Sequence, residues 1–331
     1  MKPRDLVLIG GSRGSFSVLR ALAEQWPVDV AAAICVVLHI GRHDSVLPEL
    51  MTRWGNLPAR HPVDGEALQA GTVYVAPPDR HMVVDHGHFH LNDGPAENFA
   101  RPAIDPLFRS AAPYYAQRVV GVVLSGDLDD GAAGLAVVDA LGGYTIVQNP
   151  DECEAPSMPR AAIASATVDN VVSSHELSRA ILDAIGGAAR MNPESPRKSD
   201  ELDVELRLAG TSITDPEALD HIGERSTLTC PDCGGVLWRL LDDYPLRYRC
   251  HTGHAYSALS LDEGHSKTLE NTIWAAIRAV NERIAFAHER RKWAQRTGDR
   301  DEAAHESTRI DEGEQLAALL RGALGVRNAQ T

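Results

Sequence analysis

A serine stands at the end of the first apolar run of this sequence. Residues 6–9 are apolar, the glycine-rich turn Gly-Gly-Ser-Arg-Gly follows at 10–14, and a helical pattern begins directly after it. A strand that turns through glycines into a helix lifts one side chain clear of the backbone and directs helix N–H groups at the same place. Ser12 therefore has a position suited to a nucleophile. A phosphate-binding turn and a purely structural turn are the alternative interpretations.

A histidine and a group of aspartates follow two further apolar runs. Residues 31–38 form a continuous apolar run before His39, at a position where a dinucleotide site would need an acidic residue. Residues 119–124 form another run, which leads to three aspartates within 125–131. Because parallel strands present their carboxyl ends at one edge of an open α/β sheet, these side chains are expected near Ser12. The chemistry indicated is nucleophilic: the serine attacks, the histidine takes its proton, and a carboxylate orients the imidazole.

The elements that must position these groups belong to an α/β domain. Strands buried on both faces have continuous apolar sequences, and helical patterns separate them here. The sequence therefore predicts a doubly wound, mostly parallel sheet. The chain order Ser, His, Asp differs from the Ser, Asp, His order of α/β-hydrolases, so analogy with that group does not apply.

Residues 5–187 resemble the methylesterase domain of the chemotaxis CheB proteins. The motifs that carry the resemblance recur in order over more than half of the chain: Ile9-Gly-Gly-Ser12, Val37-Leu-His39, Asp64-Gly65, Gly71–Pro77, His81, Arg101-Pro102, Asp105, Ser110-Ala-Ala, Leu124-Ser-Gly126, Asp130–Gly134, Gln148-Asn149 and Met158–Ile163.

This resemblance implies hydrolysis of γ-glutamyl methyl esters on chemoreceptor helices, in some members together with glutamine deamidation. By position, the catalytic triad of the family falls on Ser12, His39 and Asp130, although Asp127 and Asp129 are close rivals of the third member. His81 matches a family position near the active cleft. No cofactor for catalysis is implied.

Two residues depart from the family pattern beside the serine and in the aspartate loop. Arg13 replaces a usual threonine, and Asp127 replaces the methionine that lies beside the developing oxyanion. Two like charges about 4 Å apart cost on the order of 4 kcal/mol at an effective dielectric near 20. We expect Arg13 and Asp127 to face each other and neutralise, which leaves a hydrolase with altered substrate choice. The alternative is a catalytically degenerate regulatory or scaffold protein that binds receptor helices or signalling partners.

Two pairs of metal-ligating residues follow in the last third of the chain. Cys230 and Cys233 are two apart in a knuckle-like turn, and Cys250 and His254 form a second pair after a short hairpin pattern. This spacing predicts a closed tetrahedral Zn²⁺ site of the Cys₃His type, with His251 as the alternative fourth ligand. A closed site indicates a structural metal and not a catalytic one.

The remaining pattern divides the chain into four parts. Residues 1–189 form the methylesterase-like domain, 190–226 a proline- and serine-rich linker, 227–260 a zinc-ribbon-like module, and 261–331 a helical hairpin. The hairpin packs on itself or offers a surface for dimerisation or a partner. The receiver domain usual in the family is not expected, because catalytic sequence begins within the first ten residues. Regulation would then come from a signalling protein acting in trans or from the C-terminal third.

The charge balance restricts the partners. The chain has 46 acidic and 32 basic residues, a formal charge of −14, which disfavours nucleic acid and anionic membranes. It has no apolar run long enough for a membrane span and begins without a signal-peptide pattern, so a cytoplasmic protein acting on a chemoreceptor-like substrate is expected.

Overall fold

The computed structural model describes residues 3–41, 44–187, 202, 204–205, 215–241 and 245–325. The chain divides into two compact units, Met1–Leu261 and Asp262–Thr331. Most of the predicted linker, 190–226, lies outside the described residues. Its described end, from residue 215, forms a helix and the start of a strand.

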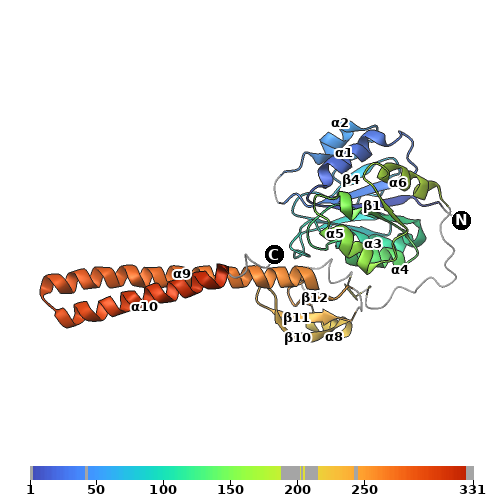
Figure 1. The fold of residues 1–331 in the computed structure, drawn as a ribbon. Coiled ribbons are helices and arrows are strands. Elements are labelled where there is room, and N and C mark those ends of the chain that lie inside the picture. The colour runs from blue at the N-terminus through green and yellow to red at the C-terminus, as the bar shows by residue number, and fades with distance from the viewer. Residues whose placement is uncertain are drawn as a thin grey trace. The chain divides into compact units, whose positions relative to one another are not determined.

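A seven-stranded parallel sheet forms the centre of the first unit (Figure 1). The strand order is β3-β4-β2-β1-β7-β8-β9, with β1 in the middle. The strands that follow β1 in the sequence are added first on one side of it and then, from β7 on, on the other side. This confirms the doubly wound α/β prediction. The bounds are β1 (Leu6–Gly11), β2 (Ala33–Leu38), β3 (Ala59–Arg60), β4 (Val73–Val75), β7 (Val119–Val123), β8 (Tyr144–Gln148) and β9 (Asn170–Val172).

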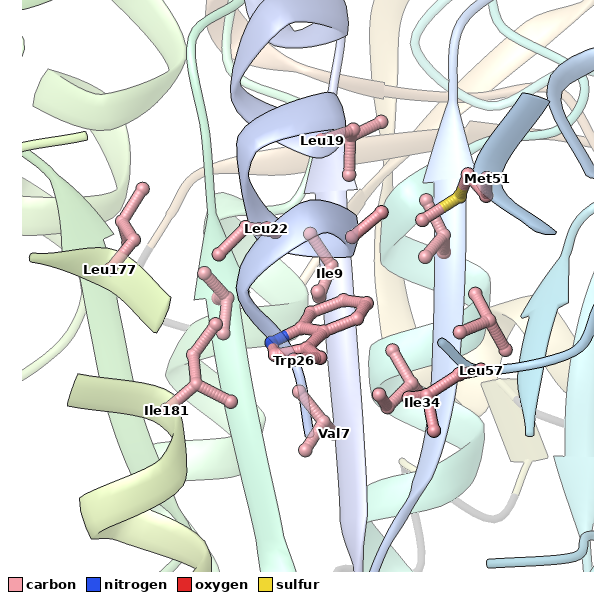
Figure 2. Packing of buried hydrophobic residues seen from close by; sticks show 14 of the residues in the cluster. Val7, Ile9, Leu19, Leu22, Trp26, Ile34, Met51, Leu57, Leu177 and Ile181 are labelled. Atoms are coloured by element: carbon pink, nitrogen blue, oxygen red, sulfur yellow. The ribbon is translucent and has the colours of Figure 1, made fainter. Parts of the chain in front are cut away.

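Helices cover both faces of this sheet, which explains why its central strands are apolar throughout. In β1, Val7 and Ile9 pack with Trp26 on one face, as Figure 2 shows, whereas Leu6 and Leu8 belong to the core of the other face. The first face carries α1 (Ser15–Gln25), α2 (Leu47–Trp54) and α6 (Leu177–Gly186); the second carries α3 (Ile104–Tyr115), α4 (Ala132–Ala140) and α5 (Ser157–Ser165), with the antiparallel hairpin β5 (His81–Asp85) and β6 (His88–Asn92) beside them. Two short 3₁₀ turns, η1 (Ala116–Arg118) and η2 (Pro150–Glu152), lie in the connections.

A second, antiparallel sheet follows the helix α8 (Pro216–Ile222). We call residues 223–257 the ribbon; its strands pair in sequence order and are β10 (Gly223–Thr229), β11 (Val236–Leu240), β12 (Arg247–Cys250) and β13 (Ala255–Ser257). Two small apolar clusters stabilise it, one around Trp238 and one around Leu237 and Tyr256.

The last two helices, α9 (Ala258–Thr297) and α10 (Arg300–Gly325), form the predicted hairpin and lie side by side (Figure 1). Gly298 has φ +80° in the connection between them, a conformation that favours glycine. Arg290 of α9 pairs with Glu302 and Glu306 of α10. Among the residues that the structure describes, no helix is long and apolar enough to cross a membrane.

Candidate active site and metal cluster

Ser12 lies in the turn between β1 and α1, at the carboxyl edge of the sheet. Its N–H donates to the carbonyl oxygen of Ser125 over 2.9 Å, which ties the turn to the end of β7. Gly14 precedes α1 with φ +84°, and a Cβ there would lie 2.7 Å from Ser125 Oγ. The turn therefore needs glycine at position 14 both for its conformation and for the close approach of Ser125.

His39 lies beside this turn because β1 and β2 are paired neighbours. Gly11 and Leu38 are in register, and the His39 N–H donates to the Gly11 carbonyl oxygen over 3.2 Å. The ring Nε2 of His39 is 2.8 Å from Asp130 Oδ2, so Nδ1 is the ring nitrogen left for another partner. Within the described part of the chain, no hydrogen bond joins Ser12 Oγ to His39. Such contacts are often long without substrate and tighten when substrate binds.

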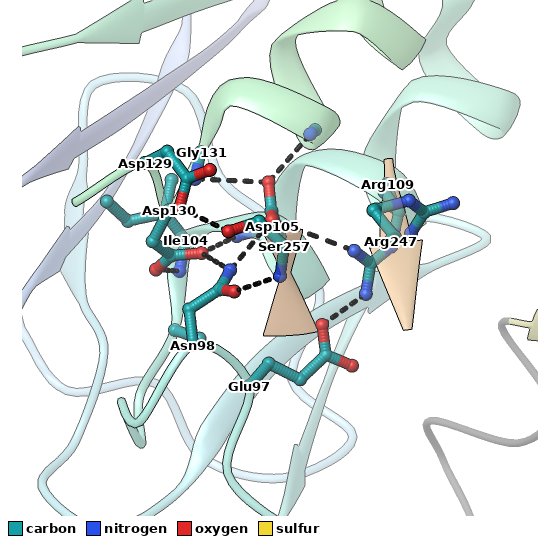
Figure 3. A network of polar contacts seen from close by, with 12 residues as sticks. Glu97, Asn98, Ile104, Asp105, Arg109, Asp129, Asp130, Gly131, Arg247 and Ser257 are labelled. Carbon is teal, nitrogen blue, oxygen red and sulfur yellow. Dashed lines mark hydrogen bonds and ion pairs between the residues drawn. The ribbon is translucent and has the colours of Figure 1, made fainter. Parts of the chain in front are cut away.

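The Asp130 carboxylate is buried and accepts hydrogen bonds from several directions (Figure 3). Besides His39, Oδ2 accepts from the Ile104 N–H over 2.6 Å, and Oδ1 accepts from the Asp105 N–H and from Asn98 Nδ2, each over 3.2 Å. Burial opposes ionisation, but the bond to His39 and these donors outweigh it and lower the pKa of Asp130. The carboxylate is thus held charged and in a fixed orientation.

The neighbouring carboxyls have other environments. Burial, together with the charge of Asp130, raises the pKa of Asp105 to about 8, and its Oδ1 accepts from the N–H groups of Gly131 and Gly134. Burial also raises the pKa of Asp129 to about 6, and Ser257 Oγ donates to it over 2.6 Å. Of the rival aspartates in this loop, only Asp130 meets His39.

Arg13 and Asp127 form the predicted ion pair. Arg13 Nη2 lies 2.9 Å from Asp127 Oδ1, and both side chains are 56% exposed. The positive charge of the turn residue therefore lies against the negative charge that replaces the family methionine. The pair is confirmed as a contact.

We expect this pair to couple weakly in catalysis. Arg13→Ala alone should lower kcat/KM, because it leaves Asp127 uncompensated near the site, and Asp127→Ala should restore it. For a pair this exposed, the coupling free energy in a double-mutant cycle on kcat/KM should be about 0.2–1 kcal/mol. A coupling energy of zero would show that the two charges act independently.

His81 is buried and fully engaged. Its Nε2 donates to the Pro95 carbonyl oxygen over 3.0 Å, and its Nδ1 accepts from the Ala103 N–H over 3.3 Å. Burial lowers the pKa of His81, which favours the neutral ring that this pattern requires. At 3% exposure, the residue holds the ends of loop 95–102 and is not among the residues that line the cavity beside His39.

A cavity of about 590 Å³ opens beside His39. Its lining includes His39 and Gly41 after β2, and residues of loop 95–102. Asp232 and His254 of the ribbon also belong to the lining. The space next to the imidazole is therefore bounded by both the α/β domain and the ribbon.

The four predicted metal ligands gather in the ribbon. The ligand atoms of Cys230, Cys233, Cys250 and His254 all lie within 4.8 Å of one another. Cys233 Sγ is 3.7 Å from Cys250 Sγ, and Cys250 Sγ is 3.5 Å from His254 Nδ1. Four ligands about 2.3 Å from a common centre in a tetrahedron are about 3.8 Å apart, so the cluster can hold a metal ion. Within the described ranges it is the one gathering of this kind.

The alternative ligand His251 is exposed and lies outside this cluster. Its ring packs over Gly235, where a Cβ would approach the His251 ring to 2.1 Å. Thr252 Oγ1 lies 2.9 Å from Cys250 Sγ, a distance suited to a hydrogen bond to a thiolate. His251 and Thr252, which lie between the ligands Cys250 and His254, therefore contact the residues around the cluster without belonging to it.

Comparison with known proteins agrees with this geometry. The model of the CheB methylesterase family matches residues 7–181, which are more than half of the chain. The chain belongs to the CheB methylesterase family. The crystal structure of the Thermotoga maritima CheB methylesterase catalytic domain superposes with a TM-score of 0.52 at 28% identity, over 54% of this chain and 97% of that one. The resemblance inferred from the motifs is confirmed.

Two relatives indicate how far the similarity extends. A protein-glutamate methylesterase/protein-glutamine glutaminase of Symbiobacterium thermophilum is 35% identical over 186 residues, which are 56% of this chain and 51% of that protein. A protein of Leptospira interrogans is 33% identical over 176 residues, 53% of this chain and 91% of its own length. The chain thus spans about half of the first relative. The described residues contain one CheB-type domain and no receiver domain.

Asn98 and Ser257 were missed by the sequence analysis. Asn98 donates to Asp130, and Ser257 donates to both Asp129 and Asn98. The two residues are 159 positions apart, and no periodicity or motif links them. The available signal was local: asparagine tolerates the left-handed backbone that residue 98 adopts, with φ +50°.

Proposed function

We propose that this chain is a serine hydrolase that removes methyl esters from glutamyl side chains of a chemoreceptor-like protein. The observation that carries the proposal is the 2.8 Å hydrogen bond between His39 Nε2 and a buried, ionised Asp130, at the strand ends next to Ser12. Membership of the CheB family supplies the substrate class, since the Symbiobacterium relative is named for protein-glutamate methylesterase activity.

The proposed reaction has two steps. Asp130 keeps the proton of His39 on Nε2, so Nδ1 is free to take the proton of Ser12 as its Oγ attacks the ester carbonyl carbon. The tetrahedral intermediate collapses, methanol leaves with the proton from His39, and an acyl-enzyme remains. Water then attacks the acyl group with His39 as base. The carboxylate is released and Ser12 regains its proton.

The oxyanion is proposed to bind at the amino end of α1. The N–H groups of Ser12 and Gly126 are engaged with the carbonyl oxygens of Ser125 and Ala155. The proposed donors are therefore the backbone N–H of Arg13, at the start of the turn into α1, and the N–H groups of residues 127 and 128 in the aspartate loop. Preorganised backbone donors of this kind account for a large part of catalysis in acyl transfer. The Arg13 side chain meanwhile neutralises Asp127.

The test is turnover of a helical peptide that carries γ-methyl glutamate. The full chain should release methanol from this peptide and leave the free glutamate, and release of ammonia from the glutamine peptide would show deamidase activity as well. Binding of the peptide without methanol or ammonia would contradict the hydrolase proposal and favour the scaffold alternative.

We further propose that the ribbon cluster holds a structural Zn²⁺. Three thiolates and one imidazole form a complete tetrahedral donor set for this ion, without an open position for a substrate. Among its described residues the ribbon has two small apolar clusters, so a bound metal would add stability that this small core does not supply. No step of the hydrolysis involves this ion.

Chelation should therefore unfold the ribbon and spare the parallel sheet. Hydrogen exchange after treatment with a strong chelator should show lost protection in residues 228–258, with protection retained in β1, β2 and β7. Cys250→Ser should lose the one zinc per chain measured by elemental analysis. Cys153→Ser, at a cysteine outside the cluster, should keep it. Simultaneous loss of protection in both regions would contradict a separate metal-dependent ribbon.

A further inference from the structure

The end of the ribbon and the first turn of α9 contact the loop that carries Asn98. The Ser257 N–H donates to Asn98 Oδ1 over 2.9 Å, and Ser260 Oγ donates to the same oxygen over 2.8 Å. Asn98 is 8% exposed, and both serines are buried. These contacts join a segment 159 residues away to the immediate surroundings of Asp130, as Figure 3 shows for Ser257.

The contacts fix which way the Asn98 amide points. A backbone N–H can only donate, so the group that faces Ser257 must be the amide oxygen. The NH₂ group then faces the opposite side, where its nitrogen lies 3.2 Å from Asp130 Oδ1 and 3.2 Å from Asp105 Oδ2. If the amide turned over, its oxygen would face the ionised Asp130 carboxylate, and its NH₂ group would face the Ser257 N–H and the Ser260 hydroxyl, which are donors. The ribbon therefore keeps a donor aimed at Asp130.

The ribbon also holds the backbone of the loop. Asn98 and Phe99 both have left-handed φ values, +50° and +63°; asparagine tolerates this conformation, but it is unfavourable for the phenylalanine. The Asn98 N–H donates to the Ala255 carbonyl oxygen over 2.9 Å, and the Ala255 N–H donates to the Ala96 carbonyl oxygen over 3.4 Å. The loop thus adds to the edge of β13, and this pairing stabilises a conformation that its sequence disfavours.

Buried ion pairs also join this loop to the ribbon. Glu97, next to Asn98, accepts from Arg109 of α3 over 2.5 Å and from Arg249 of β12 over 2.7 Å. Glu205 accepts from Arg247 of β12 over 2.6 Å and also lies 3.5 Å from Arg249. All five side chains are buried. A buried charge left without its partner is strongly destabilising, so the position of the ribbon against loop 95–100 is closely specified.

We propose that Asn98, oriented by Ser257 and Ser260, is a positioning residue for Asp130, so that the ribbon completes the catalytic site of the CheB-type domain. This inference rests on the proposed function, because it assumes that Asp130 orients the general base. Ser257 contributes a second time through its bond to Asp129, which adjoins Asp130 in the same loop.

The test compares Ser257→Ala/Ser260→Ala with Ser226→Ala in the full chain. Ser226 lies on β10 of the same ribbon, and its hydroxyl accepts only from the local Leu228 N–H among the contacts described. The double variant removes the Ser260 hydroxyl, which donates to Asn98, and the Ser257 hydroxyl, which donates to Asp129. It keeps the Ser257 N–H, which also donates to Asn98. It should lower kcat roughly 10-fold, with KM within about 2-fold, because ground-state binding does not use these groups. The Ser226 variant should retain both constants.

A spectroscopic measurement gives a readout that does not need turnover. The proton that His39 Nε2 shares with Asp130 should give a downfield resonance in the ¹H NMR spectrum of protein labelled with ¹⁵N-histidine. It should move or broaden in the double variant and stay unchanged in Ser226→Ala. Circular dichroism and zinc content should match those of the parent in both. If the double variant does not fold, Ser260→Ala alone carries the same comparison with a smaller expected effect.

The outcomes separate this inference from the proposed function. Unchanged kcat and an unchanged proton resonance in the double variant would overturn the positioning role. Equal loss in Ser226→Ala would also overturn it, because the effect would then be a general one of the ribbon. A parent protein that hydrolyses no ester, but whose resonance moves only in the double variant, would refute the proposed function and retain the positioning of Asp130.

Discussion

Ser12→Ala is expected to abolish ester hydrolysis, with kcat lowered by about 10⁴- to 10⁶-fold. The substitution removes one oxygen from the turn between β1 and α1 and leaves the glycines that shape this turn in place. His39 and Asp130 stay paired, so the loss would reflect the missing nucleophile and not a collapsed site. Methanol release measured under single-turnover conditions checks the prediction.

Ser17→Ala is the matched control for this variant. Ser17 lies one turn later on the exposed face of α1, and the same atom is removed there. It should retain kcat and KM. If Ser12→Ala kept more than about 1% of the parent kcat, covalent catalysis at this residue would be refuted, since a nucleophile contributes far more than that.

Asp130→Asn is expected to lower kcat by about 10⁴-fold, because the His39 ring loses the carboxylate that fixes its orientation and tautomer. The carboxylate accepts from His39, from two backbone N–H groups and from Asn98. An amide in its place has one acceptor oxygen and an NH₂ group that would face donors. The bond that keeps the proton on His39 Nε2 is then lost or weakened, and Nδ1 no longer remains free to take the serine proton.

The Asp130→Asn measurement combines kcat with structure. The His39 Nε2 proton resonance should disappear, while circular dichroism and zinc content should match those of the parent. Asp139→Asn is the control, because this residue of α4 is partly exposed and its side chain, among the described contacts, accepts only from the Thr167 N–H. A parent-like kcat in Asp130→Asn would show that a different carboxyl orients the base.

Much of the catalytic domain could be predicted because its signals are local. Continuous apolar runs mark the buried parallel strands, and the residue just past each strand end falls at the shared edge of the sheet. That reasoning led to Ser12 and His39. It limited the carboxylate that orients the imidazole to three neighbouring aspartates. The structure separates these neighbours by partner: Arg13 for Asp127, Ser257 for Asp129 and His39 for Asp130.

The ribbon was predicted less completely, and for physical reasons. The cysteine spacing gave the ligand set. The hairpin pattern, at 236–240 and 246–248, gave β11 and the first half of β12. Strand β10, Gly223–Thr229, is mostly exposed and polar, so it lacks the alternation that marks a half-buried strand. Strand β13 has three residues, too few for any periodicity, and its pairing with loop 95–100 depends on contacts across more than 150 positions. Long-range contacts of this kind leave no pattern in a single sequence.

The most direct test of the central claim is covalent labelling of Ser12. The full chain is incubated with a serine-reactive alkyl phosphonate and digested, and the modified peptide is identified by mass spectrometry. The account predicts one adduct, on Ser12, that forms in the parent and in Ser17→Ala and whose rate falls strongly in Asp130→Asn. An unlabelled Ser12 in folded, zinc-replete protein, or an adduct on another serine alone, would contradict it.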